Sequence, residues 1–204
     1  MTDPALLNRA ARLGAGPLPA LFVLDRDRDV TGISGTGVVA AGVIWPHLGG
    51  AAYRWCSDNP PPGHDRPVHQ IGLFGSAAEV LAVHGHQGAT RLYRHDPREQ
   101  LVDVDLLGTD GVPLVEAFAM TDGRDVTAWG AWWPVDGRAV TYCPPSSPLR
   151  RDRGPRTEQI SVWRSLDQAE ATYAAYPHQC ATVRLRSPRG RRLLDAIAAL
   201  PQSP

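Results

Sequence analysis

The sequence contains no lysine, so all 21 of its basic residues are arginines. Without lysine the chain cannot form a P-loop, because that motif needs a lysine to reach the nucleotide phosphates. Charge of one sign is not in excess either, since 21 acidic residues balance the 21 basic ones. No overall field therefore favours a nucleic acid or an acidic membrane surface.

Cysteine is scarce and long apolar runs are missing. Three cysteines, Cys56, Cys143 and Cys180, cannot make a disulfide framework. No stretch approaches the roughly 20 apolar residues that span a bilayer. The first residues, Met1 to Pro4, lack the basic start and apolar run of a signal peptide. We therefore expect a cytoplasmic protein with reduced thiols and no membrane partner.

The same sequence pattern occurs twice in the chain. Residues 38–94 and 126–186 share a series of matched positions in the same order. The matches are Gly42 with Gly130, Trp45-Pro46 with Trp133-Pro134, Trp55-Cys56 with Tyr142-Cys143, Gln70-Ile71 with Gln159-Ile160, Ser76 with Ser165, His86-Gln87 with His178-Gln179, and Ala89-Thr90 with Ala181-Thr182. A repeat of this length predicts two copies of one supersecondary unit, which usually share a core.

Each copy is expected to fold as β-β-β-α-β. A hairpin and a third strand come first, and a serine at the N-cap then starts a short helix, with Glu79 three residues after Ser76 as in a capping box. We predict an α+β fold with two tandem repeats related by a pseudo-two-fold axis, a mostly antiparallel sheet and a C-terminal helix. The expected parts are an N-terminal helical lead (1–20), the first copy (21–98), a linking β-hairpin (99–121), the second copy (122–187) and the C-terminal helix (188–204).

Two strings in the first copy are shared with a known family. The pattern Asp29-Val30-Thr31-Gly32-Ile33-Ser34-Gly35-Thr36-Gly37 is followed later by His84-Gly85-His86 and Gly88-Ala89-Thr90. In these strings the chain resembles an uncharacterised small domain family of open reading frames from actinobacteria, haloarchaea and their viruses. The resemblance covers residues 22–94. It implies no activity, because none is established for that family.

The string Ser34-Gly35-Thr36-Gly37 allows two interpretations. Consecutive backbone N–H groups of a glycine-rich loop can form an anion site. However, a strand is expected to follow the string, where a phosphate site would need a helix N-terminus. We therefore favour a tight turn that needs positive φ angles.

Two histidine strings occupy matched places in the copies, His84-Gly85-His86 and His178-Gln179-Cys180. His84, His86, His178 and Cys180 could in principle supply four zinc ligands. Their spacing matches no zinc signature, so a turn at the helix C-terminus is the favoured interpretation, and we expect no metal and no cofactor.

Three acidic residues, Asp25, Asp27 and Asp29, alternate with Arg26 and Arg28. On a strand, such alternation places the carboxylates on one face, where they could hold a divalent cation. An exposed strand end with local ion pairs is the more ordinary interpretation.

Tryptophan and arginine mark the candidate surfaces. All six tryptophans fall in expected strands, and Trp132 faces the opposite side from Trp129, so one of them could be exposed to a partner. Arginines accumulate late in the chain, and a basic cluster can bind nucleic acid through its phosphates. The candidates for that role are Arg150, Arg151, Arg153, Arg189, Arg191 and Arg192.

No established catalytic motif is present, which favours a non-catalytic protein over an enzyme. The first hypothesis is a binding or protein-interaction module whose surface includes residues 34–37, Trp129 and Trp132, with a protein or a small ligand as partner. The alternative is a small enzyme at the meeting point of Ser34, His84 and His86, with His86 as the base. The balanced charge disfavours the third hypothesis, nucleic-acid binding through the late arginines.

Overall fold

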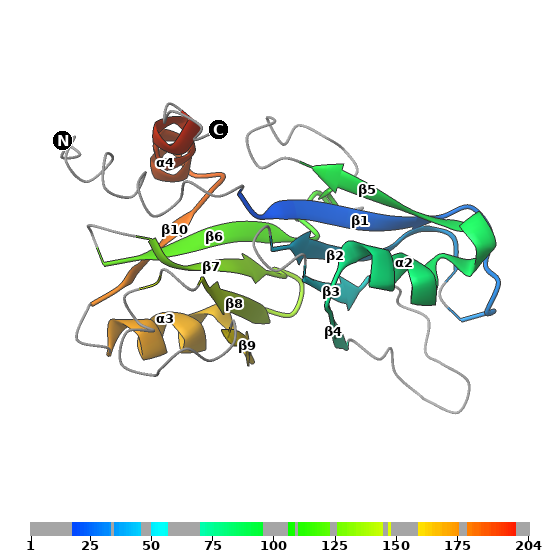
Figure 1. The fold of residues 1–204 in the computed structure, drawn as a ribbon, viewed down its shortest axis with the longest axis horizontal. Helices are drawn as coiled ribbons and strands as arrows, with labels where there is room; N and C mark the ends of the chain where they lie inside the picture. The colour runs from blue at the N-terminus through cyan, green and yellow to red at the C-terminus, as the bar shows by residue number, and fades with distance from the viewer. Residues whose placement is uncertain are drawn as a thin grey trace. The chain divides into compact units, whose positions relative to one another are not determined.

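The described residues form a mixed α+β fold, which confirms the expected class. The computed structural model describes residues 18–33, 35–45, 50–56, 70–95, 106–108, 110–122, 126–144, 147, 159–175 and 179–198. Within them lie two antiparallel five-stranded sheets and three α-helices (Figure 1). The helical lead expected before residue 18 lies outside the described residues.

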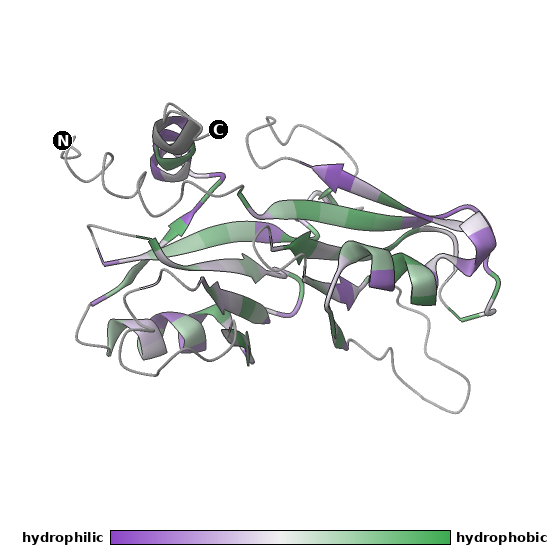
Figure 2. Cartoon of the chain, viewed as in Figure 1, coloured by the Kyte–Doolittle hydropathy of each residue, from purple (hydrophilic) through white to green (hydrophobic). Residues whose placement is uncertain are grey.

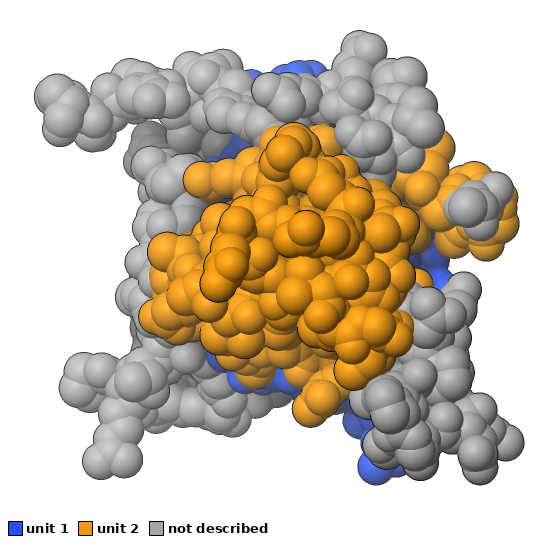
Figure 3. Space-filling view, turned by 90° about the vertical axis from the view of Figure 1, so that its right-hand side faces the viewer, with its two compact units in different colours: residues 1–18, 116–204 blue, residues 19–115 orange. Residues whose placement is uncertain are grey.

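The chain divides into two compact units. The N-terminal unit is Pro19–Val115, and the C-terminal unit begins at Glu116. Figure 3 gives each unit its own colour. Each unit contains one of the two sheets.

The N-terminal unit contains a sheet of strand order β4-β3-β2-β1-β5. Its elements are β1 (Ala20–Arg26), β2 (Gly37–Ile44), β3 (Ala51–Trp55), β4 (Ile71–Phe74), α2 (Ala77–His84), the 3₁₀ turn η1 (His86–Gly88) and β5 (Thr90–His95). The last strand, β5, pairs with the first, β1, so the two ends of the unit lie side by side.

The C-terminal unit contains a sheet of order β10-β6-β7-β8-β9. Its elements are β6 (Glu116–Thr121), β7 (Val126–Trp132), β8 (Ala139–Cys143), β9 (Gln159–Trp163), α3 (Leu166–Ala174), β10 (Ala181–Arg184) and α4 (Pro188–Ala198). The fifth strand again pairs with the first, β10 with β6. If the strands of each unit are numbered in chain order, both sheets have the same spatial order: fourth, third, second, first, fifth.

Each sheet has one more strand than the sequence suggested for a copy. The expected unit started at Val38 and Val126, whereas the structure places β1 and β6 ahead of these residues in the same sheets. Residues 113–120 were expected in a linking hairpin with 101–107. Of that hairpin, the described residues show only the bridge between Leu107 and Pro113, and residues 116–121 form β6. The matched letters begin after these strands, which is why sequence comparison did not include them.

The first strands are apolar on both faces. In β1, the four residues from Leu21 to Leu24 are all at most 1% exposed, and Figure 2 shows the strand mainly in the hydrophobic colour. A continuous apolar run of this kind is typical of a strand covered on both sides. One side forms a core with α2, in which Phe22, Leu24 and Tyr53 pack with Val80.

A phenylalanine lies opposite a glycine at the centre of each sheet. Phe22 pairs with Gly42, and Phe118 pairs with Gly130. Two residues later the ladder shifts register in both sheets, between Leu24 and Asp25 and between Met120 and Thr121. A side chain at either glycine would collide with the phenylalanine ring. The glycines are therefore required by close approach rather than by turn geometry.

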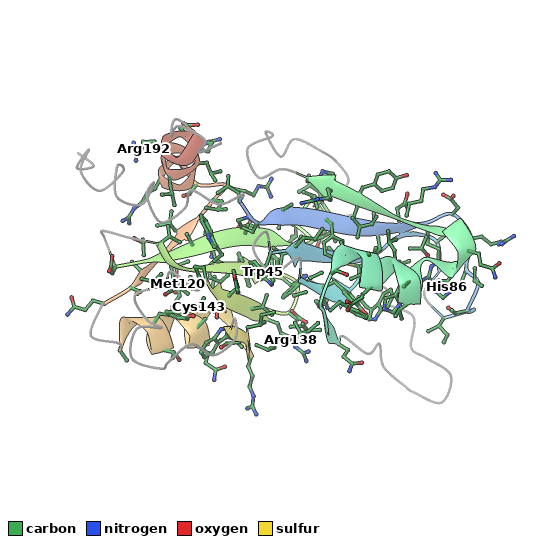
Figure 4. All side chains as sticks on the ribbon, in the orientation of Figure 1. Trp45, His86, Met120, Arg138, Cys143 and Arg192 are labelled. Atoms are coloured by element: carbon green, nitrogen blue, oxygen red, sulfur yellow. The ribbon has the colours of Figure 1, made fainter. Side chains whose placement is uncertain are left out.

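The tryptophan that follows the second strand is buried in both units. Trp45 and Trp133 are each 0% exposed, and Trp45 is labelled in Figure 4. The backbone N–H of Trp45 donates to the Gly50 carbonyl at 2.8 Å, and that of Trp133 donates to the Arg138 carbonyl at 2.9 Å. These bonds close the hairpins that the sequence predicted.

Both sheet-covering helices begin with a reciprocal cap. The Ser76 hydroxyl accepts from the Glu79 N–H at 3.1 Å, and the Glu79 carboxylate accepts from the Gly75 N–H at 3.0 Å. Ser165 and Gln168 make the same pair of bonds at the start of α3. The capping box predicted at Ser76 is confirmed.

None of the helices within the described ranges is long and apolar enough to cross a bilayer.

The two central glycines should respond differently to a compensating change. We expect Gly130→Ala to destabilise the protein by about 1–3 kcal/mol, because the new methyl overpacks the core. The three atoms nearest to that methyl all belong to the Phe118 ring, so Phe118→Leu should restore much of the loss. At Gly42 the nearest atom is the Ala52 carbonyl oxygen, so Phe22→Leu should not rescue Gly42→Ala. Urea denaturation of the four variants and the two double variants measures both effects, and equal rescue at both sites would contradict the prediction.

Candidate functional site

The glycine-rich loop after β1 is organised around the Asp29 carboxylate. This carboxylate accepts hydrogen bonds from the backbone N–H groups of Thr31 at 3.0 Å, Gly32 at 2.9 Å and Gly35 at 2.9 Å. The Thr31 hydroxyl adds a fourth bond at 3.1 Å. Desolvation raises the pKa of Asp29, but these bonds outweigh it and hold the pKa below its ordinary value.

The anion bound by this loop is therefore the Asp29 carboxylate of the chain itself. The Gly32 and Gly35 N–H groups, which could have faced a phosphate, are occupied by Asp29. Gly32, Gly35 and Gly37 have φ angles of 70°, 70° and 81°, so the expected tight turn with positive φ is confirmed. Thr36 is exposed. Ser34 lies outside the described residues.

Arg26, the last residue of β1, is a buried cation. Its side chain is only 1% exposed. Its Nε donates to the Thr90 hydroxyl at 3.0 Å, and its Nη1 lies 3.9 Å from Asp29 Oδ1. Within the described part of the chain, Nη1 has no hydrogen-bond partner. Burial lowers the pKa of the guanidinium and the Asp29 charge opposes this, but the group stays charged.

The His84-Gly85-His86 turn joins α2 to β5 and packs against the end of β1. The Gly85 carbonyl accepts from the N–H groups of Gly88 at 2.9 Å and Thr90 at 3.0 Å. The Asp27 N–H donates to the Ala89 carbonyl at 2.9 Å. His86, labelled in Figure 4, has a φ of 45°, in the left-handed region where a side chain is strained. Strain of this kind is concentrated at functional sites.

His84 sits in a cluster of aromatic rings, which we call the His84 cluster: Tyr53, Trp55, Phe74 and His84. Its Nε2 lies 2.7 Å from the Tyr53 hydroxyl, and the centroids of the Trp55 and Phe74 rings lie 4.9 Å and 5.7 Å from that of the imidazole. Burial lowers the pKa of His84, and the nearby charges of His86 and Arg26 lower it further. The lowered pKa favours the neutral imidazole, and the tautomer of that ring decides whether Nε2 accepts from or donates to the Tyr53 hydroxyl.

Arg26 lies between the two strings that the sequence singled out. Asp29 and its loop are on one side, and Thr90 with the histidine turn is on the other. The exposed strand end expected from the alternating charges of residues 25–29 is wrong for Arg26, because this residue is buried. The sequence did contain a signal that Arg26 is buried, because Phe22, Leu24 and Arg26 are alternate residues of β1 and share one face.

The residues considered as metal ligands do not gather in the described structure. His84 and His86 lie in the N-terminal unit, and His178 is outside the described residues. Cys180 is a buried thiol of the C-terminal unit, 3.3 Å from the Thr127 hydroxyl, and burial raises its pKa. Among the described residues, no group of three or more His, Cys, Asp or Glu could hold a metal ion.

The strand registers identify the counterpart of the His84 cluster in the C-terminal unit. Tyr53 pairs with Gly42 as Thr141 pairs with Gly130, so these two positions correspond. Counting along β8 then matches Trp55 with Cys143. The match of Trp55-Cys56 with Tyr142-Cys143 made from the sequence is therefore wrong by one residue, because identical letters suggested a shifted register.

Counting from the two helix caps matches His84 with Tyr173 and Phe74 with Trp163. In the C-terminal unit these positions form a closed polar core. The Tyr173 hydroxyl donates to the Thr141 hydroxyl at 3.1 Å and lies 3.3 Å from the Cys143 sulfur. Burial and the neighbouring thiol raise the pKa of Tyr173 far above its ordinary range. This counterpart therefore has no ring that titrates near neutral pH.

The tryptophans proposed as a partner surface differ in exposure. Trp129 is only 4% exposed and lies in the core, so it does not face solvent. Trp132 is partly buried, and the Arg184 guanidinium lies 4.3 Å from the centroid of its ring system. Trp132 is therefore the one of this pair that remains partly accessible.

The late arginines fall into two groups. Arg150, Arg151 and Arg153 lie outside the described residues. Arg189, Arg191 and Arg192 are exposed on α4; Arg192 is labelled in Figure 4.

A protein-family model matches the sheet-forming part of the N-terminal unit. Residues 19–96 are similar to the family described as Acb5 phage protein. The match runs from just before β1 to just after β5, well under half of the chain. It supports the phage-related part of the resemblance seen in the sequence, and it names no actinobacterial or haloarchaeal member. No curated protein and no solved structure matches the chain.

The amides bound by Asp29 should report its titration. We expect the Thr31, Gly32 and Gly35 N–H signals to shift together on acidification, with a midpoint below the ordinary aspartate pKa of about 3.9. Folding stability from this carboxylate is present above that ordinary pKa and is lost as the pH falls through the folded one. NMR titration of the amides measures the midpoint, and Asp29→Asn should abolish the transition. A midpoint at or above the ordinary value would refute the loop assignment.

The His84 ring should titrate below the ordinary histidine pKa of about 6.5. Because the unfolded ring then binds its proton at a higher pH than the folded ring, stability should fall as the pH drops through that ordinary value. Removing the Arg26 charge with Arg26→Gln should raise the pKa of His84. Ring-proton NMR of the wild type and the variant tests both statements, and an unchanged titration in Arg26→Gln would show that the two groups do not interact.

Proposed function

We propose that the protein is a non-catalytic binding module whose N-terminal unit holds a small anionic ligand beside Arg26. The observation that carries this proposal is the buried Arg26 guanidinium, whose Nη1 has no hydrogen-bond partner in the described residues. Burying a charged donor without a partner is costly, and a ligand oxygen would remove that cost.

The surroundings of Arg26 suit an anion. Asp29 lies at 3.9 Å, beyond a good hydrogen bond, and its oxygens already accept four bonds from the loop. His84 and His86 are half-buried and lie close enough to be coupled electrostatically. The histidine turn, in which His86 has a left-handed φ, therefore lies beside the buried guanidinium.

The C-terminal unit lacks this chemistry at the matching position. Arg26 is the fourth residue after Phe22, and the fourth residue after Phe118 is Asp122. A carboxylate there would repel the same ligand. The site therefore belongs to the N-terminal unit, which is also the part that is similar to the Acb5 phage protein family.

The two units are proposed to be tandem repeats related by a pseudo-two-fold axis, as the sequence suggested. Support comes from the shared strand order, the register shift at the same place, and the matching phenylalanine–glycine pairs and caps. The family match to one unit alone is consistent with duplication. We keep the cytoplasm as the proposed location, because all three cysteines are free thiols.

The second candidate function is the small enzyme. It is favoured by one observation, the neutral His84 ring hydrogen-bonded to Tyr53, which makes His84 rather than His86 the candidate base.

Inorganic phosphate is the probe for the proposed site. We expect it to shift the NMR signals of His84, His86 and Gly35, and Arg26→Gln to weaken its affinity about tenfold or more, since charged hydrogen bonds are worth about 1.5–3 kcal/mol. Arg94→Gln is the matched control, because Arg94 is an exposed arginine at the far end of the neighbouring strand β5. Arg26→Lys keeps the charge and tests whether Arg26→Gln merely unfolds the unit.

Equal weakening by Arg94→Gln, or no phosphate-dependent shift in the wild type, would exclude the site. Turnover of a chromogenic phosphate ester that is lost in His84→Gln would replace the binding module by the enzyme.

A further inference from the structure

We propose that an arginine surface at the start of α4 binds the phosphate backbone of a nucleic acid. The surface, called the α4 arginine patch, consists of Arg184, Arg189, Arg191 and Arg192. All four side chains are exposed. The patch belongs to the C-terminal unit and shares no residue with the proposed Arg26 site.

The backbone under the patch is held firmly against β10. The Ser187 hydroxyl donates to the Arg184 carbonyl at 2.6 Å and accepts from the Gly190 N–H at 3.0 Å. Gly190 approaches Leu185 so closely that any side chain would collide with the backbone. Leu193 and Leu194 are buried on the inner face of α4. The arginines thus project from a fixed support, which lowers the entropy cost of binding.

The α4 arginines have no partner in the described structure. Arg186, which lies next to the patch, is paired with Glu116 at 3.9 Å. In contrast, no ion pair of Arg189, Arg191 or Arg192 occurs within the described residues, and Asp195 is the one acidic side chain described in α4. The patch therefore carries a net positive charge although the whole chain is neutral.

The α4 arginines lie near the N-terminus of the helix, where the helix dipole disfavours a positive charge. The N-terminus of a helix carries a partial positive charge, so acidic residues stabilise the first turn and basic ones destabilise it. The first turn of α4 contains no acidic residue. A bound anion would offset the repulsion that Arg189 and Arg191 meet in this first turn.

A nucleic-acid backbone fits this surface better than a membrane. An amphipathic helix that binds a bilayer needs an apolar face to insert, and Leu193 and Leu194 of α4 are buried within the chain. Arginine also presents a planar fork that matches phosphate oxygens in pairs. Several exposed forks on one fixed turn provide the repeated phosphate contacts on which sequence-independent binding depends.

A labelled DNA duplex of about 20 base pairs, titrated at several salt concentrations, tests the proposal. We expect affinity to fall as salt rises. The double variant Arg189→Gln/Arg192→Gln should weaken binding and reduce the slope of log affinity against log salt by about two. The control Arg94→Gln/Arg164→Gln removes the same charge from exposed arginines outside the patch and should leave the slope unchanged.

Three outcomes would overturn the proposal. They are no duplex binding at low salt, an equal loss in the patch and control variants, or patch-dependent binding to anionic vesicles with none to DNA. Arg26→Gln keeps the patch intact, so its DNA binding should match the wild type whether or not the Arg26 site binds phosphate. Circular dichroism of the patch variant shows whether α4 remains folded.

Discussion

The candidate site depends on the antiparallel pairing of the last strand of the N-terminal unit with its first. This pairing places Thr90 beside Arg26 and so brings the turn after α2 next to the loop after β1. The residues involved are more than 60 positions apart in the sequence. Without the β1–β5 ladder, the buried guanidinium, the Asp29 loop and the histidine turn would have no common location.

Local features of this fold were readable from the sequence, and the long-range ones were not. The capping box at Ser76 and the glycine turns follow from short-range hydrogen bonding and backbone sterics, and both were predicted. Arg26 was assigned to the surface because alternating charges usually mark a solvated strand. The structure buries it because β1 continues past Leu24 with the same face inward, and a single sequence does not show which strand lies beyond its edge.

The two units illustrate the same limit. Identical letters aligned Trp55 with Tyr142, whereas the hydrogen-bond register aligns Trp55 with Cys143. Register is set by the whole sheet, through the pairing of each strand with both neighbours. The error matters for the site, because in the correct alignment the His84 cluster corresponds to the buried polar core around Tyr173. One backbone layout thus supports different polar chemistry in its two units.

The contact between Phe118 and Gly130 makes the order of sequence changes matter. A larger residue at position 130 is acceptable only after position 118 has become smaller, so the two positions form a coupled pair whose effects do not add. Gly42 faces a backbone carbonyl as well as Phe22, and no single side-chain change can make room there. Of the two central glycines, Gly130 of the C-terminal unit is therefore the one that a larger residue can replace, once position 118 has become smaller.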